Sequence, residues 1–271
     1  MGHEVVIIGG GAAGLSAALM LTRARRSVLV VDGAEPRNKP AAHMHNYLSR
    51  DGLSPLDLLK HGRAEVEGYG GEIVNDQVKS VTKTGDGFAV ELFGRTVHAQ
   101  RLLFATGLVD EVPENLRDRW GRDVFGCPYC HGYEVRDQKL VVFGEEMKVA
   151  LVRQWSADVT HVPTVDGIEV EDDRLVAVIS GSDRIPADAL VYSAPVKPRD
   201  EFLLALGAET AETMAGPFVR TDDKGRTSVP GVYAAGNVTD PTAIVIVAAA
   251  QGAQAAGMIN MDLLGLMPAA G

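Results

Sequence analysis

The sequence predicts an α/β fold of two domains, the second smaller than the first and inserted into it. Three observations lead to this fold class. A β-branched run, a glycine turn, an amphipathic helix and a second apolar run follow one another over residues 4–32. A similar pattern starts again with KLVVFG at residues 139–144 and continues to residue 162. The chain then returns to a strand and glycine turn at residues 229–241 and ends in a helical segment rich in small residues.

The remaining elements follow from hydrophobic spacing and turn residues. Residues 33–55 predict a loop, residues 54–70 a helix, and residues 72–74, 78–82, 88–92 and 102–105 strands. In the second half, a strand pair around 168–180 and a strand at 189–194 precede one long helix over 242–264. We therefore place the first domain at residues 1–115 and 226–271, and the second domain at residues 116–225.

Composition is that of an ordinary soluble enzyme, with 46% hydrophobic and 23% charged residues among 271. The formal net charge of −10 argues against a nucleic-acid-binding surface. The longest apolar stretch near the C-terminus, residues 243–250, is far shorter than the ~20 residues of a membrane span. A strand pattern begins almost at the N-terminus, so we expect no secretory signal and a cytoplasmic location.

The first candidate site is a dinucleotide cradle at Gly9, Gly11 and Gly14, between a strand and a helix. The first glycine permits the tight turn, the second lets a pyrophosphate approach the backbone, and the third permits close helix–strand packing. Asp32 ends the next strand, where its carboxylate can accept hydrogen bonds from ribose hydroxyls. A glycine turn without a ligand is the alternative.

The second candidate site is VFGCPYCHGYEV, residues 124–135, which contains the only two cysteines, Cys127 and Cys130. Pro128 suits the first position of a helical turn and so places Cys127 at a helix N-terminus, where a thiolate is favoured. His131 is close enough in sequence to exchange protons with either sulfur. A redox-active disulfide in a reducing compartment is the interpretation that we favour.

Other chemistries stay open at this motif. Zinc needs four ligands, and although His43, His45 and His131 could complete a set, nothing in their spacing requires it. A C-x-x-C-H haem attachment is typical of exported proteins, and a structural thiol pair is the remaining alternative. We predict no metal site.

Two further segments indicate the cofactor. GVYAAGNV, residues 231–238, resembles the second flavin motif of flavoproteins with two dinucleotide domains, and LLFATG, residues 102–107, resembles their connecting motif. The whole chain resembles low-molecular-weight thioredoxin reductases, which implies two Rossmann-like domains, bound FAD and a homodimer. That family usually has Asp at the position of Asn237. We assign FAD binding to Gly9, Gly11, Ala12, Ala13, Gly14, Asp32, Arg37, Asn38, Ala105, Thr106, Gly107, Gly236, Asn237 and Ala243.

The resemblance also implies roles for the cysteines. Cys130 is the thiolate that faces the flavin, and Cys127 is the outward thiol that meets the substrate. His131 stands where the family usually has Asp, and we assign it proton transfer. The loop at residues 35–52 matches one that runs along the flavin, so we include His45 in the catalytic set with Cys127, Cys130 and His131. Solvated loop histidines are the alternative for both His43 and His45.

The second domain departs from the reductase pattern. Where a glycine triplet for NADPH is expected, the chain reads Gly144-Glu145-Glu146, and carboxylates repel a pyrophosphate. The segment at residues 163–166, PTVD, replaces the basic stretch that binds the 2′-phosphate. We therefore do not expect NADPH to bind.

CPYCHG together with a degenerate NADPH site resembles the FAD-dependent dithiol oxidases of the gliotoxin and holomycin type. This resemblance implies oxidation of a small-molecule or protein dithiol, with O₂ as acceptor and H₂O₂ as product. Two alternatives remain: a thioredoxin reductase-like enzyme whose FAD is reduced by a protein electron donor such as a ferredoxin, and a non-catalytic flavin-binding redox sensor.

Overall fold

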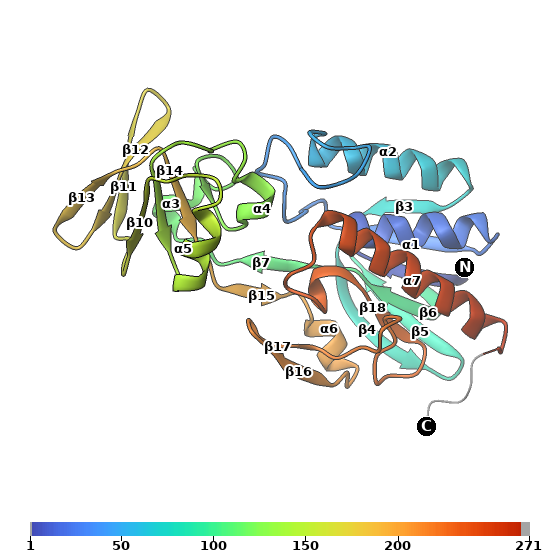
Figure 1. Ribbon diagram of the computed structural model, residues 1–271. Helices are drawn as coiled ribbons and strands as arrows, with labels where there is room; N and C mark the ends of the chain where they lie inside the picture. The colour runs from blue at the N-terminus through green and yellow to red at the C-terminus, as the bar shows by residue number, and fades with distance from the viewer. Residues whose placement is uncertain (1, 267–271) are drawn as a thin grey trace. The chain divides into compact units, whose positions relative to one another are not determined.

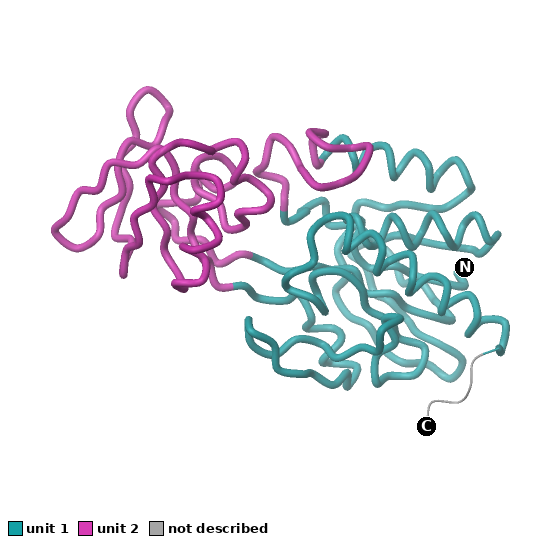
Figure 2. Tube along the Cα trace, viewed as in Figure 1, with its two compact units in different colours: residues 1–37, 56–109, 196–271 teal, residues 38–55, 110–195 magenta. Residues whose placement is uncertain are grey.

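The computed structural model describes residues 2–266 and divides the chain into two compact units. Unit 1 comprises Met1–Arg37, Leu56–Val109 and Val196–Gly271, and unit 2 comprises Asn38–Pro55 and Asp110–Pro195 (Figure 2). Each unit contains a sheet with parallel strands and a βαβ connection, which confirms the predicted α/β class. The last five residues of the predicted segment 226–271 lie outside the described residues.

The unit boundaries differ from the predicted domain boundaries. The first unit resumes at Val196 rather than at residue 226, and residues 38–55 group with the second unit. The physical reason lies in α6 (Glu201–Ala205) and the hairpin β16 (Thr210–Thr213)–β17 (Gly216–Val219). Leu203 and Val219 from these elements are buried in the core of unit 1. The chain leaves unit 1 through β7 (Leu108–Asp110) and returns to it through β15 (Val196–Pro198), and these two strands pair with each other.

Unit 1 is built on one seven-stranded sheet (Figure 1). Its order is β3-β2-β1-β6-β5-β4, and β18 pairs with the C-terminal half of β6. The strands β3, β2, β1, β6 and β18 are parallel, whereas β4 and β5 form an antiparallel meander with β6. The strands are β1 (Gly2–Ile8), β2 (Val28–Asp32), β3 (Glu72–Asn75), β4 (Val78–Thr84), β5 (Gly87–Leu92), β6 (Thr96–Phe104) and β18 (Val232–Ala234).

Both faces of this sheet are covered, because alternate residues of β1 enter different cores. Val5 and Ile7 pack with the long helices α1 (Ala12–Arg23) and α7 (Val245–Leu263). Val6 and Ile8 pack on the other face with residues of β4–β6, α6 and β17. A parallel strand that is buried on both faces reads as a continuous apolar run, and this explains the pattern of residues 4–8. The helix α2 (Pro55–Gly68) connects to β3.

Two sequence predictions in unit 1 were imprecise. The predicted helix over 242–264 begins only at Val245, because Asp240 accepts hydrogen bonds from both the backbone N–H and the hydroxyl of Thr242 and holds a turn there. A short 3₁₀ turn, η1 (Gly236–Val238), precedes it. The strand predicted at 102–105 extends back to Thr96, where β6 pairs with β5.

Unit 2 contains a four-stranded parallel sheet of order β10-β9-β14-β8. Its strands are β8 (Val124–Phe125), β9 (Leu140–Phe143), β10 (Val159–Val162) and β14 (Ala189–Tyr192). The antiparallel strands β11 (Gly167–Glu171), β12 (Arg174–Ser180) and β13 (Asp183–Pro186) form a separate sheet. The helices are short: α3 (Glu114–Arg117), α4 (Pro128–His131) and α5 (Glu146–Val152).

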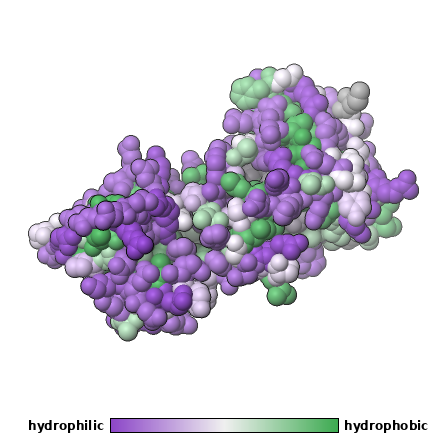
Figure 3. All heavy atoms as spheres, turned by 90° about the horizontal axis from the view of Figure 1, so that it is seen from above, coloured by the Kyte–Doolittle hydropathy of each residue, from purple (hydrophilic) through white to green (hydrophobic). Residues whose placement is uncertain are grey.

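The surface drawn in Figure 3 is mostly hydrophilic, with hydrophobic residues in scattered groups. Among the helices of residues 2–266, none is long and apolar enough to cross a membrane.

The contact between α1 and α7 depends on the absence of a side chain at Gly252. A Cβ placed there would lie 2.0 Å from the carbonyl oxygen of Ala13, which is backbone and cannot move aside cheaply. Gly257, one turn further along the same helix, would place its Cβ 3.4 Å from the flexible end of Met20. A side chain at Gly252 would therefore clash with the backbone of α1, whereas a small side chain at Gly257 can be accommodated.

We predict that Gly252→Ala lowers the free energy of unfolding by about 1–3 kcal/mol, because overpacking outweighs the better helix propensity of alanine. Gly257→Ala is the matched control and should be neutral or stabilising by up to about 1 kcal/mol. Urea denaturation of both variants measures the difference. Equal stabilities would show that α1 and α7 do not pack as closely as described.

Candidate functional site

The glycine turn after β1 has the shape of a phosphate cradle. Gly9 has φ +111°, and a Cβ on it would lie 2.3 Å from the carbonyl oxygen of Ala105. A Cβ on Gly14 would lie 1.9 Å from the carbonyl oxygen of Gly9. By contrast, a Cβ on Gly11 would meet nothing within 4 Å. The first and third glycines therefore permit packing, and the second leaves open space beside the turn.

The N-terminus of α1 faces this open space without a side-chain cap. The twelve-residue helix begins at Ala12, and Gly11 is its N-cap residue. No side-chain cap accepts a hydrogen bond from its first N–H groups. Uncapped N–H groups and the helix dipole favour an anion. The turn and helix thus fit the pyrophosphate of a dinucleotide.

Asp32 lies at the end of β2 next to the same turn, since a Cβ on Gly10 would fall 2.5 Å from its Oδ2. Its Oδ1 accepts a hydrogen bond of 3.1 Å from the backbone N–H of Ala34, and its Oδ2 accepts one from Arg63. Arg63, on α2, also donates to Asn75 at 3.1 Å. The sequence prediction missed Arg63, because no local pattern links α2 to the end of β2. A carboxylate has about four lone-pair sites, so acceptor capacity for ribose hydroxyls remains.

The predicted connecting segment, Ala105 to Gly107, follows β6 and crosses close to the glycine turn. The backbone N–H of Ala105 donates to Ile8 at 2.8 Å, and the hydroxyl of Thr106 donates to the carbonyl of Arg199 at 2.6 Å. Gly107 has φ +72°, and its carbonyl accepts from the N–H of Arg199 at 3.0 Å. This segment anchors the end of β6 to the strand β15 that returns to unit 1.

The second glycine turn lies against the first. Gly236 has φ +80°, and a Cβ on it would lie 3.0 Å from the Cβ of Ala13. Its N–H donates to Gln251 of α7 at 3.1 Å. The structure therefore brings Gly236 to the N-terminus of α1.

Asn237 is held by its amide group rather than used as a lone acceptor. Its Nδ2 donates to the carbonyls of Asp240 and Ala243, both at 2.9 Å. Its Oδ1 accepts from Arg37 at 3.4 Å. The paired N–H contacts account for Asn in place of Asp, because a carboxylate cannot donate to two carbonyls. Asn38, predicted with Arg37, belongs to unit 2, where its carbonyl accepts from Ala41 at 3.0 Å.

The cysteine motif forms a single helical turn in unit 2. Cys127 is the N-cap of α4, Pro128 is its first residue, and Cys127 and Cys130 form a disulfide with Cα atoms 5.3 Å apart. The ring of Tyr129 meets that of Trp155 edge-on at 5.7 Å. The carbonyl of Tyr129 accepts a 2.7 Å hydrogen bond from Asn46. The turn is thus held from residues 38–55 as well as from the helix that precedes Trp155.

A cluster of titratable side chains lies beside this turn. Nε2 of His45 is 3.3 Å from the carboxylate of Glu134, and Nδ1 of His45 is 3.3 Å from that of Asp51. Burial lowers the pKa of His131, whereas the negative charge of Glu134 acts to raise it and the neighbouring His45 acts to lower it. The ring of His131 also meets Phe125 at 4.9 Å. The structure therefore brings His45 and His131 into one electrostatic cluster.

Glu134 is the member of this cluster that sequence reasoning missed. It follows His131 by three residues, and the only local signal was that spacing. His43 lies apart, with its Nδ1 3.0 Å from the carbonyl oxygen of Gly52. Within residues 2–266 no group of three or more His, Cys, Asp and Glu residues is placed to hold a metal ion.

The turn after β9, at the position of a second nucleotide cradle, packs closely against other residues of unit 2. Gly144 has φ +135°, and a Cβ on it would lie 2.1 Å from the hydroxyl of Ser193. His161 approaches the carbonyl of Gly144 at 2.8 Å. Glu145 is the N-cap residue of the seven-residue α5, and Glu146 lies in its first turn.

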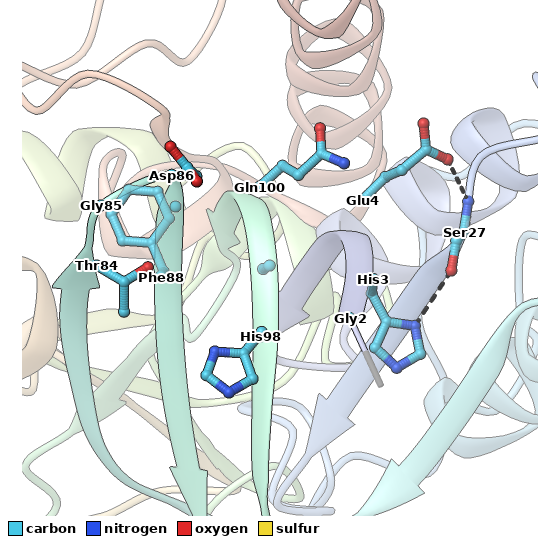
Figure 4. Close-up of a pocket in the computed structure, with 12 residues that line it drawn as sticks. Gly2, His3, Glu4, Ser27, Thr84, Gly85, Asp86, Phe88, His98 and Gln100 are labelled. Atoms are coloured by element: carbon cyan, nitrogen blue, oxygen red, sulfur yellow. Dashed lines mark hydrogen bonds between the residues drawn. The ribbon is translucent and has the colours of Figure 1, made fainter.

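One open cavity of about 490 Å³ lies at the N-terminal ends of β1 and β6, beside the β4–β5 turn (Figure 4). Three of its polar residues are hydrogen-bonded to one another: Glu4 accepts from the N–H of Ser27 at 2.8 Å, and His3 is 3.3 Å from the hydroxyl of Ser27. Ligands of α/β sheets bind at the carboxyl ends of the strands. This cavity is at the opposite end of the strands from Gly9 and so is not the dinucleotide site.

We predict that Glu134→Gln lowers the pKa of His131, because the charge that favours the imidazolium is removed while burial is unchanged. The folded-state pKa of His131 is already depressed, so its neutral form supports the fold above the unfolded pKa of ~6.5, and this support is lost as the pH falls. Titration of the imidazole NMR signals measures the shift. Glu171→Gln, on exposed β11, is the control, and an equal response in both variants would contradict the cluster.

Comparisons with known proteins agree with the α/β fold. Over residues 3–144 and 134–257 the chain matches the family described as pyridine nucleotide-disulphide oxidoreductase. Thioredoxin reductase sirT of Leptosphaeria maculans is 29% identical over 97% of this chain and 94% of its own length. Thioredoxin reductase aclD of Aspergillus oryzae is 36% identical over 49% of this chain and 44% of its own. A probable thioredoxin reductase of Arthroderma benhamiae is 32% identical over 52% and 38%, so the last two are matched over less than half of their length.

Solved structures match over nearly the whole chain. The crystal structure of HlmI has a TM-score of 0.92 and 43% identity, and the match covers 98% of this chain and 93% of that one. A putative thioredoxin reductase, TrxB, from Bacillus anthracis has a TM-score of 0.89 and 30% identity, with 97% and 99% covered.

Proposed function

Because this chain belongs to the pyridine nucleotide-disulphide oxidoreductase family, we propose that it is an FAD-dependent dithiol oxidase. It converts two thiols of a substrate into a disulfide, with O₂ as acceptor and H₂O₂ as product. The observation that carries the proposal is a Cys127–Cys130 disulfide in a unit whose glycine turn after β9 packs against Ser193 and is followed by Glu145. Its thioredoxin reductase-like relatives confirm the predicted resemblance and support an oxidoreductase.

Family membership implies that the chain binds FAD. The residues that fit it are the first glycine turn with the uncapped N-terminus of α1, Asp32, and the second glycine turn at Gly236. Arg37 and Asn237, which are hydrogen-bonded to each other, lie at the same end. When bound, FAD supplies a two-electron relay between the cysteine pair and the acceptor.

The chain's own chemistry is thiol–disulfide exchange. A substrate thiolate attacks Sγ of Cys127, which breaks the Cys127–Cys130 bond and forms a mixed disulfide, with Cys130 leaving as a thiolate. The second substrate thiol then attacks the substrate sulfur that is bonded to Cys127. This closes the substrate disulfide and releases Cys127 as a thiolate. The substrate has lost two protons and two electrons, and the cysteine pair has gained the electrons. His131 is suited to accept a proton, because burial favours its neutral form.

The turn after β9 supports the absence of NADPH from this cycle. A dinucleotide pyrophosphate needs open backbone and positive potential at the N-terminus of the following helix. Here Ser193 lies against Gly144, and Glu145 and Glu146 bring two carboxylates to the start of α5. The charge and the side-chain bulk of these two glutamates act against the nucleotide. The homodimer and the cytoplasmic location stay predictions.

We predict that anaerobic dithiothreitol bleaches the flavin absorption of the purified protein, that NADPH does not, and that air restores the colour with one H₂O₂ formed per dithiol oxidised. Cys130→Ser should stay yellow but should not be bleached by dithiothreitol, because the disulfide cannot form. Stopped-flow absorbance and a peroxide assay measure these outcomes. Rapid bleaching by NADPH would overturn the oxidase proposal in favour of a reductase. Bleaching by dithiothreitol with no peroxide on aeration would favour a different acceptor.

A further inference from the structure

Lys148 is a half-buried cation that the proposed cycle does not use. It lies in the first turn of α5, and its Nζ donates to the hydroxyl of Ser193 at 2.5 Å and to the carbonyl of Gly126 at 3.4 Å. Burial lowers its pKa, and the neighbouring carboxylate of Glu145 acts in the opposite direction. A lysine that loses solvent in this way needs a compensating role for its charge or its hydrogen bonds.

The position of this ammonium in the sheet is specific. Gly126 directly follows β8, Gly144 follows β9, and Ser193 follows β14, so all three lie at the carboxyl ends of parallel strands. In open α/β sheets the ligand binds at the carboxyl ends of the strands. Here a side chain of the same unit joins two of the three strand ends by hydrogen bonds.

The contact with Gly126 connects Lys148 to the redox motif. The carbonyl that accepts from Nζ belongs to the peptide group that joins Gly126 to Cys127. A cation that binds this peptide orients the residue that caps α4 and places positive charge one peptide group from the sulfur that the substrate attacks. Positive charge near a cysteine favours its thiolate.

We propose that Lys148 is a positioning residue for Cys127, holding the Gly126–Cys127 peptide and favouring the Cys127 thiolate once the disulfide is open. This role rests on the proposed function only in that Cys127 is the sulfur that exchanges with substrate. In this proposal the carboxyl ends of the unit 2 strands serve thiol chemistry in place of nucleotide binding.

The test uses the full chain with its flavin in a Cys130→Ser background, in which Cys127 is the only cysteine. Iodoacetamide alkylates the thiolate, forming a thioether and releasing iodide, and its rate is followed from pH 6 to 10, a range chosen to be about centred on an ordinary thiol. Lys148→Met should slow alkylation at neutral pH by about three- to tenfold, and the rates should converge at high pH where the thiol is ionised without help.

Three further variants separate charge from structure. Lys148→Arg retains the positive charge and should restore most of the rate. Lys148→Gln keeps a hydrogen-bond donor, so it should fold even if Lys148→Met does not. Because it also lacks the positive charge, its alkylation should be as slow as that of Lys148→Met. Lys139→Met removes an exposed lysine of the same unit and should leave the rate unchanged.

The other titratable groups around the turn are identical in all variants: His131 with Glu134, His45 and Asp51 on one side, and Glu145 beside Lys148. A pH–rate profile of Lys148→Gln that coincides with that of the parent would overturn the proposal. Alkylation needs neither electron transfer to flavin nor O₂. A failure of the oxidase proposal therefore leaves this result standing, and a failure here leaves the oxidase proposal intact.

Discussion

Close backbone contact around the N-terminus of α1 is the constraint on which the rest of unit 1 depends. The carbonyl of Gly9 lies where a side chain of Gly14 would be, and the carbonyl of Ala13 lies where a side chain of Gly252 would be. The turn can close on α1 only because Gly14 has no side chain, and the distant helix α7 can approach α1 only because Gly252 has none. The same contact sets the second glycine turn, since Gly236 lies against Ala13. The open space at Gly11 is what remains once these contacts are made.

Unit 2 shows how a similar sheet loses this property. It also has a parallel sheet and a glycine with positive φ after its strand β9. In unit 2, however, a hydroxyl and an imidazole contact Gly144, and two glutamates follow it where unit 1 has further glycines. The free energy that a nucleotide would gain from backbone N–H groups is opposed by side-chain bulk and by like charge. Instead, Lys148 connects the carboxyl end of β14 to the segment that carries the cysteines, through hydrogen bonds to Ser193 and Gly126.

Electrostatics around the cysteine turn come from groups far apart in the chain. His131 and Glu134 are neighbours in α4 and the turn after it, whereas His45 and Asp51 come from the loop that belongs to the same unit. Burial favours neutral His131 and Glu134 opposes that preference. Burial is the larger effect, so the pKa of His131 lies below its ordinary value and the neutral ring, which can accept a proton, is favoured.

The sequence by itself determined the α/β class, the two βαβ units, the glycine turns and the cysteine motif, because each is encoded in local spacing: β-branched runs, glycines at fixed intervals and Pro128 after Cys127. It could not place the return to unit 1 at Val196, since the burial of Leu203 and Val219 is a long-range contact. It also could not find Arg63 beside Asp32, Glu134 beside His45, or Lys148 beside Gly126. Only the tertiary structure decided these pairs, because hydrogen bonds and ion pairs between separate elements leave no periodic pattern in the chain.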